Sequence, residues 1–433
     1  MNSSSVFQKI DCMLWMRIHR LPQVFAQRWQ LRELQRAVAY AYKEVPLYRK
    51  LFDKQGVAPS DVRTLDDVRR LPITSKQLFR RHPLEETTAA AFPGKIVWKE
   101  TSGSTGEPFR FPSSYVHYLM RRFGPVGIGA RTIAFMAWGN ILPVEMFQRL
   151  RIAEIRVHCE PRFKHFLHIP VSDLRKRPET VVPRLKEFAP DLLNAHATIL
   201  VELARLAHRF SPEERPHIPY MISHGEVLTR TQRNYIREVF GAEPYNRYGL
   251  EEVGSVAIDC ENHTGGHIHE ESFIVEILDE ADRPLPEGET GRIVITYFYN
   301  DVMPIIRYDT GDQGVVASGP CACGVPARRI LVDGRKGGFL TIGSRRFNNV
   351  EFEVLLGRMS DNILRYQVAK VAPDAVLLRI IPVDRFREED LAFVRERFRE
   401  EFGFAPEIKI VDDIAYAAGG KGRFITDETS EKS

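Results

Sequence analysis

Short apolar runs alternate with stretches of helical period through the middle of the chain. The expected strands are residues 132–138, 191–196, 220–224 and the approach to Tyr245, and the expected helices are residues 179–188, 198–210 and 230–240. Apolar runs of about four to eight residues are typical of buried strands, and a period of about 3.6 residues is typical of helices. Their regular alternation predicts an α/β fold in which helices cover a mostly parallel sheet.

The N-terminal part has a different pattern, in which apolar positions recur at helical spacing between turn signals. Residues 30–80 predict helices joined by short turns. Val45-Pro46 and Leu71-Pro72 are expected to stop helices, because proline disfavours helical geometry in the residue before it. This region is therefore expected to be structural.

The last part of the chain predicts antiparallel and α+β structure. The expected strands are residues 272–278, 291–297, 375–381 and 408–411, and the expected helix is residues 388–402. The first two strands flank a turn-rich run and predict a hairpin. Gly334, Gly337 and Gly338 mark the domain boundary, because closely spaced glycines ease a sharp change in chain direction. We expect a large N-terminal domain over residues 1–335, with parallel sheet layers and an antiparallel β portion, and a small, mobile α+β C-terminal domain over residues 336–433.

The composition is that of a folded protein with more than one domain. Of its 433 residues, 43% are hydrophobic and 27% are charged, so a sizeable core is expected. The 61 basic and 57 acidic residues are spread along the chain, which argues against a nucleic-acid partner. Lys9, Asp11, Arg17 and Arg20 interrupt the apolar N-terminus, so neither a membrane span nor a signal peptide is predicted. The expected location is cytoplasmic.

Residues 101–108, with the sequence TSGSTGEP, form a loop rich in hydroxyl side chains and glycine. Backbone N–H groups and hydroxyls of such a loop can converge on phosphate oxygens without obstruction by bulky side chains. The loop lacks the lysine of the Gly-x4-Gly-Lys-Ser/Thr motif, so it does not match the P-loop NTPases. By itself this composition is equally typical of a flexible linker.

Further motifs follow this loop along the chain. They are His224-Gly225-Glu226, Asn246-Arg247-Tyr248-Gly249-Leu250-Glu251-Glu252, Ile306 to Asp312, Gly334-Arg335 and Gly419 to Phe424. In content and order these motifs resemble those of the adenylate-forming enzymes, which include acyl-CoA ligases, luciferases and peptide-synthetase adenylation domains. Residues 45–49 and 71–76 resemble the phenylacetate–CoA ligase and capsule-biosynthesis-type branch specifically. The resemblance covers nearly the whole chain and implies a large N-terminal adenylate-forming domain.

The resemblance implies a role for each motif. Tyr248 is expected beside adenine, and the Asp312 carboxylate on the two ribose hydroxyls. Glu252, rather than Glu251, is expected to bind Mg²⁺, because a hard cation prefers oxygen ligands. Lys421 is expected to stabilise charge as the adenylate forms. The implied catalytic residues are Lys421, Glu252 and Thr105, and the implied ATP- and AMP-binding residues are Thr101, Ser102, Gly103, Ser104, Thr105, Gly106, Gly225, Glu226, Asn246, Tyr248, Gly249, Asp312 and Arg335.

Three further positions bear on this interpretation. Glu251 stands where the family usually has serine or threonine, and Gly338 stands where an aspartate usually follows the hinge arginine. Gly338 indicates that the hinge rotates by a different backbone route. His196 is the last residue of a predicted strand and could line an acyl pocket, since ligands of α/β sheets bind at the carboxyl ends of strands. It is not taken as a site residue, because histidine at such a position is more often structural.

Clustered cysteines predict a structural metal. The expected zinc ligands are Cys260, His267, Cys321 and Cys323. Three thiolates and one imidazole form a usual tetrahedral zinc set, and four protein ligands leave no position for a reactive water. The spacing also resembles a metal site found in part of the phenylacetate–CoA ligase group. His263 or His269 could replace His267 as the nitrogen ligand, and a buried thiol pair without metal is the alternative.

These observations predict an ATP-dependent carboxylate ligase that forms an acyl-adenylate with release of pyrophosphate. By resemblance, the acyl group of a small carboxylic acid then passes to coenzyme A, and relatives that use an amine acceptor leave an amide ligase open. A non-catalytic, zinc-stabilised nucleotide-binding protein is the alternative from another class, suggested by Gly338 and Glu251. The expected cofactors are ATP, Mg²⁺, structural Zn²⁺ and coenzyme A. The acid is not identified, and a homodimer is left open.

Overall fold

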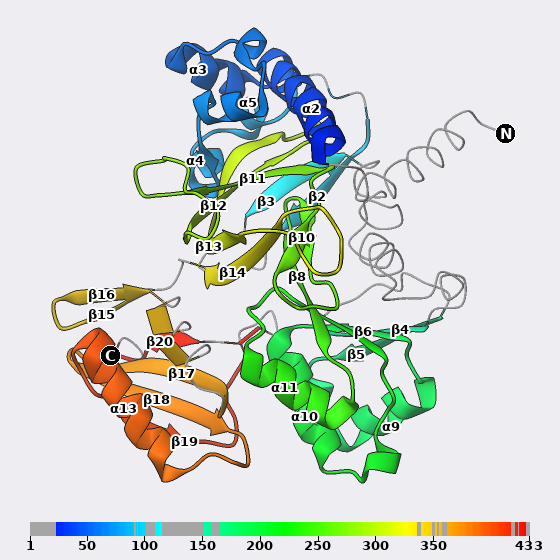
Figure 1. The fold of residues 1–433 in the computed structure, drawn as a ribbon, viewed down its shortest axis with the longest axis vertical. Helices are drawn as coiled ribbons and strands as arrows, with labels where there is room; N and C mark the ends of the chain where they lie inside the picture. Colours follow the sequence, from blue (N-terminus) through cyan, green and yellow to red (C-terminus); the bar gives the residue numbers. More distant parts are fainter. Residues whose placement is uncertain are drawn as a thin grey trace. The chain divides into compact units, whose positions relative to one another are not determined.

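The computed structural model describes most of the chain. The described residues are 23–90, 92, 94–100, 109–114, 151–157, 165–335, 339–348, 351–352, 355–356, 362–416, 421–422 and 424–429. The chain divides into two units (Figure 1), and each is built from two segments. The segments of unit 1 are Met1–Phe147 and Arg247–Val332, and those of unit 2 are Gln148–Asn246 and Asp333–Ser433.

Unit 1 contains helices whose ends are set by proline and glycine. Helix α2 (Gln23–Glu44) and helix α3 (Pro46–Gln55) are separated by Val45, which is extended at φ −114° and ψ 110°. The expected stop at Val45 is therefore confirmed, and Pro46 begins the next helix, where its missing N–H costs no hydrogen bond. The shorter elements that follow are the 3-10 helices Pro59–Asp61 and Leu65–Arg70, β1 (Thr74–Ser75), α4 (Lys76–Arg80), α5 (Leu84–Thr87), β2 (Ile96–Glu100) and β3 (Arg110–Ser114).

The main sheet of unit 1 is largely antiparallel. Its strands are β8 (Pro244–Leu250), β9 (Gly254–Ile258), β10 (Gly266–Ile268), β11 (Phe273–Leu278), β12 (Gly291–Tyr297), β13 (Ile305–Ala317) and β14 (Arg329–Arg335). Their order is β11-β12-β13-β14-β10-β9-β8, and β1 pairs in parallel with β13. The antiparallel pairing of β11 with β12 confirms the expected hairpin. Apolar side chains of these strands share one core with Leu34 of α2 and Tyr48 of α3.

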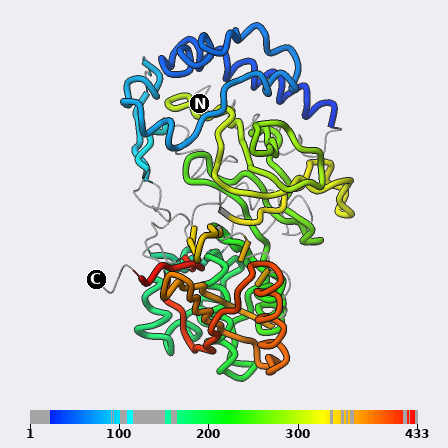
Figure 2. The backbone as a smooth tube through the Cα atoms, turned by 90° about the vertical axis from the view of Figure 1, so that its left-hand side faces the viewer, coloured from blue at the N-terminus to red at the C-terminus, as the bar shows by residue number. Residues whose placement is uncertain are grey.

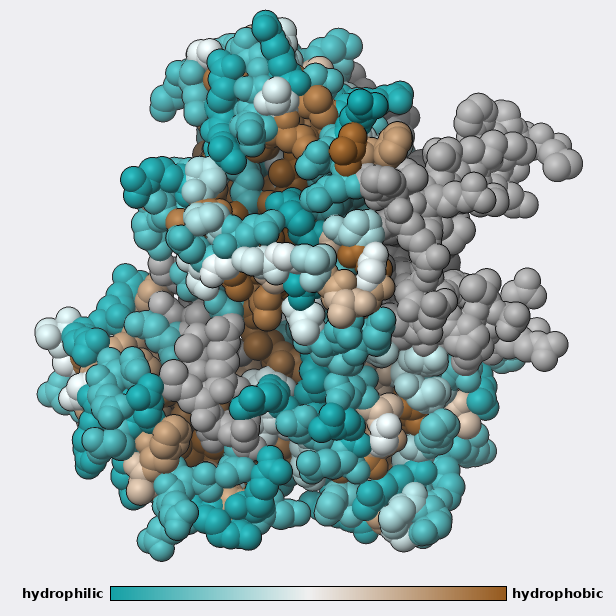
Figure 3. All heavy atoms as spheres, viewed as in Figure 1, coloured by the Kyte–Doolittle hydropathy of each residue, from teal (hydrophilic) through white to brown (hydrophobic). Residues whose placement is uncertain are grey.

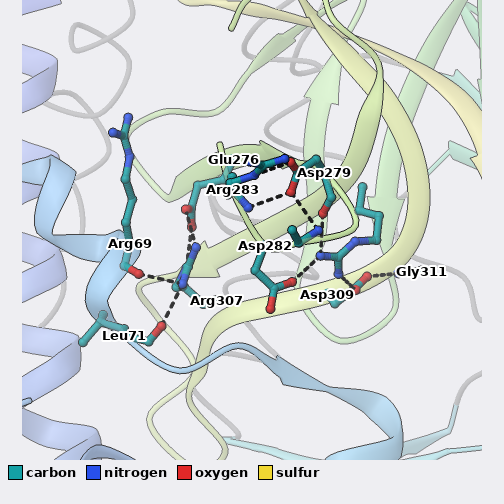
Figure 4. A network of polar contacts seen from close by, with 11 residues as sticks. Arg69, Leu71, Glu276, Asp279, Asp282, Arg283, Arg307, Asp309 and Gly311 are labelled. Carbon is teal, nitrogen blue, oxygen red and sulfur yellow. Dashed lines mark hydrogen bonds and ion pairs between the residues drawn. The ribbon is translucent and has the colours of Figure 1, made fainter. Parts of the chain in front are cut away.

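A buried ion pair fastens the segment before β1 to this sheet (Figure 4). The guanidinium group of Arg307 on β13 donates to both carboxylate oxygens of Glu276 on β11, at 3.1 and 3.0 Å. It also donates to the carbonyl oxygens of Arg69 at 3.0 Å and Leu71 at 2.8 Å. The side chains of Arg307 and Glu276 are only 4% and 9% exposed. The pair therefore holds the strand that carries the predicted ribose ligand, Asp312.

Replacing Arg307 with alanine is expected to lower the free energy of unfolding by about 3–5 kcal/mol, because it leaves the Glu276 carboxylate buried without its partner. Urea unfolding followed by circular dichroism measures the loss. The matched control Arg397→Ala removes a partner of Glu401 on the surface of helix α13 (Glu388–Phe402) and should cost no more than about 1 kcal/mol. Equal losses in the two variants would contradict this role of the buried pair.

Unit 2 contains a parallel sheet in the order β7-β6-β4-β5. Its elements are β4 (Arg151–Arg156), β5 (His165–Pro170), α8 (Asp173–Lys176), α9 (Pro178–Phe188), β6 (Leu192–Ala195), α10 (Ala197–His208), the 3-10 helix Pro212–Glu214, β7 (Tyr220–His224) and α11 (Arg230–Phe240). The strands and helices expected between residues 179 and 240 are confirmed, whereas β4 and β5 were not expected. The strand expected at 132–138 lies outside the described residues. Parallel strands alternating with helices confirm the predicted α/β layer.

The C-terminal part of unit 2 forms a smaller sheet in the order β19-β18-β17-β20. Its elements are β15 (Phe339–Ile342), β16 (Arg345–Asn348), β17 (Ile363–Ala372), β18 (Ala375–Pro382), α13, β19 (Glu407–Ile410) and β20 (Ile425–Asp427). The expected helix and the strands that became β18 and β19 are confirmed, and the fold class is the one predicted. That residues 336–433 move as a separate domain stays a prediction.

Within unit 2, the C-terminal part lies against the part that carries the parallel sheet (Figure 2). Gln232 on α11 donates to the carbonyl oxygen of Leu364 on β17 at 2.9 Å, and the Leu364 side chain joins the apolar core beneath α9 to α11. The ring of Tyr416 contacts two arginines, with the guanidinium carbons of Arg175 and Arg365 at 4.6 and 4.8 Å from its centre. These contacts anchor the chain a few residues before Lys421.

The surface shown in Figure 3 is mainly hydrophilic, and apolar side chains are exposed there only in scattered patches. Among the residues that the structure describes, no helix combines the length and the apolar character needed to cross a membrane.

Candidate active site and metal cluster

Two nucleotide-site residues predicted from separate motifs meet in unit 1. The hydroxyl of Tyr248 on β8 donates to the Asp312 carboxylate on β13 at 2.9 Å. Gly311, with φ 73°, turns the backbone just before Asp312, whose N–H donates to the Thr310 hydroxyl at 3.1 Å. Asp312 is buried, and a carboxylate offers about four acceptor sites. The Tyr248 hydroxyl thus joins the two motifs at the Asp312 carboxylate.

Gly249 follows Tyr248 and is required by a close backbone approach. A Cβ atom at this position would lie 2.5 Å from the carbonyl oxygen of Gly254, where β9 begins. No side chain can be accommodated without moving that backbone, so the tight turn between β8 and β9 needs glycine. This turn brings Glu252 back toward the sheet.

Glu252 and Glu251 have different surroundings, although they are adjacent. Glu252 is buried and accepts a hydrogen bond from the Tyr308 hydroxyl at 3.3 Å, whereas Glu251 is exposed. Tyr308 belongs to the same strand as Asp312 and stacks on Phe79. The buried carboxylate is thus oriented by another predicted motif. Its role as a magnesium ligand stays a prediction.

In unit 2, the predicted catalytic lysine lies beside the glycine turn that follows β7. Gly225 has φ 74°, a conformation that favours glycine. A Cβ atom there would also lie 3.1 Å from the His196 ring and 3.3 Å from Cε of Lys421. Both the backbone conformation and the crowding therefore exclude a larger residue at Gly225. The fold brings Lys421 to this turn from near the other end of the sequence.

Glu226, the next residue, is bonded to two other segments of unit 2. Its carboxylate accepts from the backbone N–H of Thr198 at 2.8 Å and from the Thr198 hydroxyl, also at 2.8 Å. It accepts a third hydrogen bond from the backbone N–H of Gly422. These are charge-assisted bonds, which are stronger than bonds between neutral groups. The Glu226 carboxylate is thus directed toward the protein itself.

His196, which the sequence interpretation did not select, packs in the same place. It lies just before α10, with Nδ1 at 2.8 Å from the carbonyl oxygen of His224. Because a carbonyl oxygen can only accept, Nδ1 carries the hydrogen. Burial lowers the pKa of His196, and the positive charge of Lys421 acts in the same direction, whereas Glu226 opposes the shift. The only sequence signal was its place at the end of a predicted strand.

The remaining predicted residues are less informative. Asn246 is half-buried on β8, and Arg335 is the last residue of β14. The expected phosphate loop lies outside the described residues, as do its members Thr101, Ser102, Gly103, Ser104, Thr105 and Gly106. The structure therefore leaves the assignment of these residues to nucleotide binding as a prediction.

The four expected zinc ligands gather in unit 1. Cys260 follows β9, His267 lies on β10, and Cys321 and Cys323 lie on the turn between β13 and β14. Their ligand atoms all lie within 4.8 Å of one another. Gly324, with φ 77°, closes the second turn by donating its N–H to the carbonyl oxygen of Cys321 at 3.1 Å. Two tight turns thus present four ligand atoms to one point.

The distances in this cluster fit a tetrahedral zinc ion. The sulfur atoms of Cys260 and Cys321 are 3.6 Å apart, and Nε2 of His267 is 3.3 Å from the sulfur of Cys323. Zn–S bonds of about 2.3 Å and Zn–N bonds of about 2.0–2.1 Å require separations of about 3.5–3.8 Å at tetrahedral angles. A disulfide would need about 2.05 Å, so the cysteines are free thiols.

A second hydrogen bond fixes the tautomer of His267. Its Nδ1 lies 2.9 Å from the carbonyl oxygen of Ala327, so Nδ1 carries the hydrogen and Nε2 presents its lone pair to the thiols. Zinc-binding histidines usually have such a support. The alternatives are directed elsewhere, since His269 pairs with Ser255 at 3.2 Å and His263 with Asp259 at 3.3 Å. The fold therefore selects His267.

The thiols differ in their acidity. Burial raises the pKa of Cys260 and of Cys323. Burial also acts to raise that of Cys321, but hydrogen bonds from the backbone N–H of Cys323 and from neighbouring side chains outweigh it and lower the pKa to about 7. One thiolate, the metal-binding form, is therefore accessible at neutral pH. The donor set and its protonation fit zinc.

Comparison with known proteins agrees with the fold. No model of a known protein family matches the chain. A phenylacetate–coenzyme A ligase from Thermus thermophilus is 29% identical over 360 residues, which cover 81% of this chain and 79% of that protein. This chain is therefore similar to a phenylacetate–coenzyme A ligase over most of its length. The CapK protein of Staphylococcus aureus is 19% identical over 403 residues, covering 89% of this chain and 85% of CapK.

A solved structure of a coenzyme A ligase has the same fold as this chain. It is a 2-hydroxyisobutyryl-CoA ligase in the postadenylation state, in complex with R3-HIB-AMP, with a TM-score of 0.75 and 19% identity. The alignment covers 96% of this chain and 92% of the ligase. The predicted resemblance to phenylacetate–CoA ligases and capsule-biosynthesis-type proteins is confirmed by these sequence relatives, and the solved structure confirms the predicted α/β fold.

Proposed function

We propose that this protein is an ATP-dependent carboxylate ligase that forms an acyl-adenylate, releases pyrophosphate and transfers the acyl group to coenzyme A. The similarity to phenylacetate–coenzyme A ligases over most of the chain carries this proposal. The geometry adds support, because Tyr248 pairs with Asp312 in unit 1 and Lys421 lies at the Gly225 turn in unit 2.

In the proposed reaction, a substrate carboxylate oxygen attacks the α-phosphorus of ATP, and the bond from that phosphorus to the β-phosphate bridge oxygen breaks. Displacement at phosphorus depends on positioning and on neutralisation of charge, and it needs no protein nucleophile. The Lys421 ammonium group supplies positive charge at the reacting oxygens. Glu252 would provide an oxygen ligand for Mg²⁺, and the bound ion would offset negative charge on the phosphates. Thr105 and its loop would hold the phosphates.

The proposal is tested by pyrophosphate release over a panel of aromatic and aliphatic carboxylic acids, each with coenzyme A or with amines as acceptor. At least one acid should give ATP-dependent release and a coenzyme A thioester detectable by mass spectrometry. Release that ends in an amide would replace coenzyme A as the acceptor. ATP binding without release for any acid would favour a non-catalytic nucleotide-binding protein instead.

Replacing Asp312 with alanine is expected to weaken ATP binding by about 10- to 100-fold, because each lost hydrogen bond to a charged group costs about 1.5–3 kcal/mol. Isothermal titration calorimetry measures the dissociation constant. The control Asp279→Ala removes another carboxylate of unit 1, which is bonded within its own turn to the backbone of Ala281 and Arg283. An unchanged dissociation constant for Asp312→Ala would count against ribose binding.

We also propose that Cys260, His267, Cys321 and Cys323 hold one structural zinc ion. The support is the converging geometry of their ligand atoms and the fixed tautomer of His267. When bound, the ion would cross-link the turn after β9 to the turn after β13 and leave no open coordination position for a substrate. The metal would act on stability and not on the chemistry.

A further inference from the structure

The carboxylate of Glu226 connects the loop that carries the proposed catalytic lysine to the start of a helix. Its oxygens accept from the N–H and the hydroxyl of Thr198, the second residue of α10, and from the N–H of Gly422. α10 has 12 residues, and the partial positive charge of its N-terminus favours a carboxylate there. The start of α10 therefore holds the Glu226 carboxylate in place. The same carboxylate holds the backbone N–H of Gly422, the residue after Lys421.

Close packing leaves no room for a side chain at Gly422. A Cβ atom on Gly422 would lie 2.8 Å from Cγ2 of Thr198. Thr198 is buried, and its hydroxyl is held by Glu226, so its methyl group cannot rotate away without breaking that bond. On the other side of the lysine, a Cβ atom on Gly225 would lie 3.3 Å from Cε of Lys421, which is closer than an ordinary contact. The lysine backbone and stem are thus confined from two directions.

We propose that Glu226 is a positioning residue. Its bonds to Thr198 and Gly422, called here the Glu226 bridge, hold the Lys421-Gly422 backbone against α10 and so keep the lysine ammonium group in place for adenylate formation. This inference rests on the proposed function, in which Lys421 acts on the reacting carboxylate and α-phosphate. It assigns Glu226 a role through the lysine in place of the direct nucleotide contact that the family resemblance implied. Lysine has a flexible stem of four carbons, so the position of its charge depends on where its backbone is held.

If the Glu226 bridge positions the lysine, its loss should lower the rate of pyrophosphate release without changing nucleotide affinity. Glu226→Gln keeps the size of the side chain but removes the charge that binds three donors. It should lower the rate constant of pyrophosphate release by about 10- to 100-fold, the factor expected for loss of a charge-assisted anchor. The ATP dissociation constant should change by less than about threefold, because in this proposal Glu226 acts through the lysine and not on the nucleotide. The control is Glu202→Gln, which removes a carboxylate of α10 that pairs with Arg205 and does not contact Gly422 in the bonds described above.

A second pair of variants tests the packing. Gly422→Ala places a methyl group against the Thr198 methyl and should slow pyrophosphate release to a similar extent. Thr198→Ser keeps the hydroxyl and N–H that bind Glu226 but removes Cγ2, the atom that the new methyl would meet. The double variant Thr198→Ser/Gly422→Ala should therefore recover most of the rate lost in Gly422→Ala. General destabilisation would instead add the two losses.

Hydrogen exchange provides a readout that needs no substrate. The amide of Gly422 donates to Glu226, so the peptide that contains Gly422 should exchange faster in Glu226→Gln than in the wild type or in Glu202→Gln. Unchanged exchange of the Gly422 peptide in Glu226→Gln would contradict the proposed role of the Glu226 bridge. A raised ATP dissociation constant with an unchanged rate constant of pyrophosphate release would also contradict it. Failure of the wild type to release pyrophosphate with any acid would refute the proposed function, while the exchange result would still decide whether the contact exists.

Discussion

Replacing Lys421 with alanine is expected to lower the rate of pyrophosphate release by about 100- to 1,000-fold. The variant lacks the ammonium group that offsets negative charge between the substrate carboxylate and the α-phosphate, and single preorganised charge-stabilising groups contribute factors of this size. Lys421 is half-exposed, so its truncation leaves no cavity in the core. The melting temperature and the ATP dissociation constant should therefore stay close to those of the wild type.

The matched control is Lys409→Ala, which removes a lysine of β19 whose side chain is 57% exposed and pairs only weakly with Glu407 at the surface. It should release pyrophosphate at the wild-type rate. Wild-type activity in Lys421→Ala would refute the catalytic role. A loss confined to ATP affinity would instead make Lys421 a nucleotide-binding residue. Calorimetry measures the affinity and the rate constant measures the chemistry, so the two measurements together distinguish these roles.

Protein purified without chelators is expected to contain close to one zinc ion per chain, and the Cys321→Ser/Cys323→Ser variant should contain almost none. The melting temperature of the variant should fall by at least about 5 °C, because zinc binding contributes directly to folding and a loss of 1 kcal/mol lowers the melting temperature of a domain of this size by about 2–4 °C. Elemental analysis and calorimetry measure the two effects. Activity at low temperature should be retained in the fraction that stays folded.

Histidine variants refine this test. His267→Ala should lose zinc, whereas His263→Ala should keep it, because His263 lies against Asp259 and outside the cluster. Loss of zinc only in His263→Ala would show that the wrong nitrogen ligand had been assigned. Wild-type protein without zinc, together with an unchanged melting temperature in the double cysteine variant, would remove the metal from this account.

Elements with local end signals could be predicted from the sequence. Helix α11 occupies residues 230–240 as expected, because the Thr229 side chain accepts from the N–H of Gln232 and Gly241 ends the helix at φ 72°. Such signals lie within a few residues of the helix they bound. Strand β17 was missed although residues 364–368 alternate between apolar and polar side chains, and its polar members Arg365 and Gln367 are buried in the folded chain.

The chemistry available to the site could also be predicted, because short motifs carry it. The sequence determined that Tyr248, Asp312 and Lys421 are candidates, since the order of motifs along the chain does not depend on packing. Which histidine joins the thiols depended on strand geometry. His267 lies on β10 opposite Ile258, whereas His269 lies beyond the end of that strand and contacts Ser255.

Only the tertiary structure decided which distant groups are partners. Glu226 and Gly422 are 196 residues apart, and Arg307 reaches the carbonyl oxygen of Arg69 across 238 residues. A local pattern shows that a carboxylate or a guanidinium group is present, but many donors and acceptors elsewhere in the chain could satisfy it. Burial removes water from a charged group, so the group must pair with a donor or acceptor of the protein. The tertiary structure determines which of these lie close enough. For this reason the sequence determined the fold class and the chemical groups of the candidate site, while the folded chain determined what holds Lys421, His267 and the Asp312 strand in place.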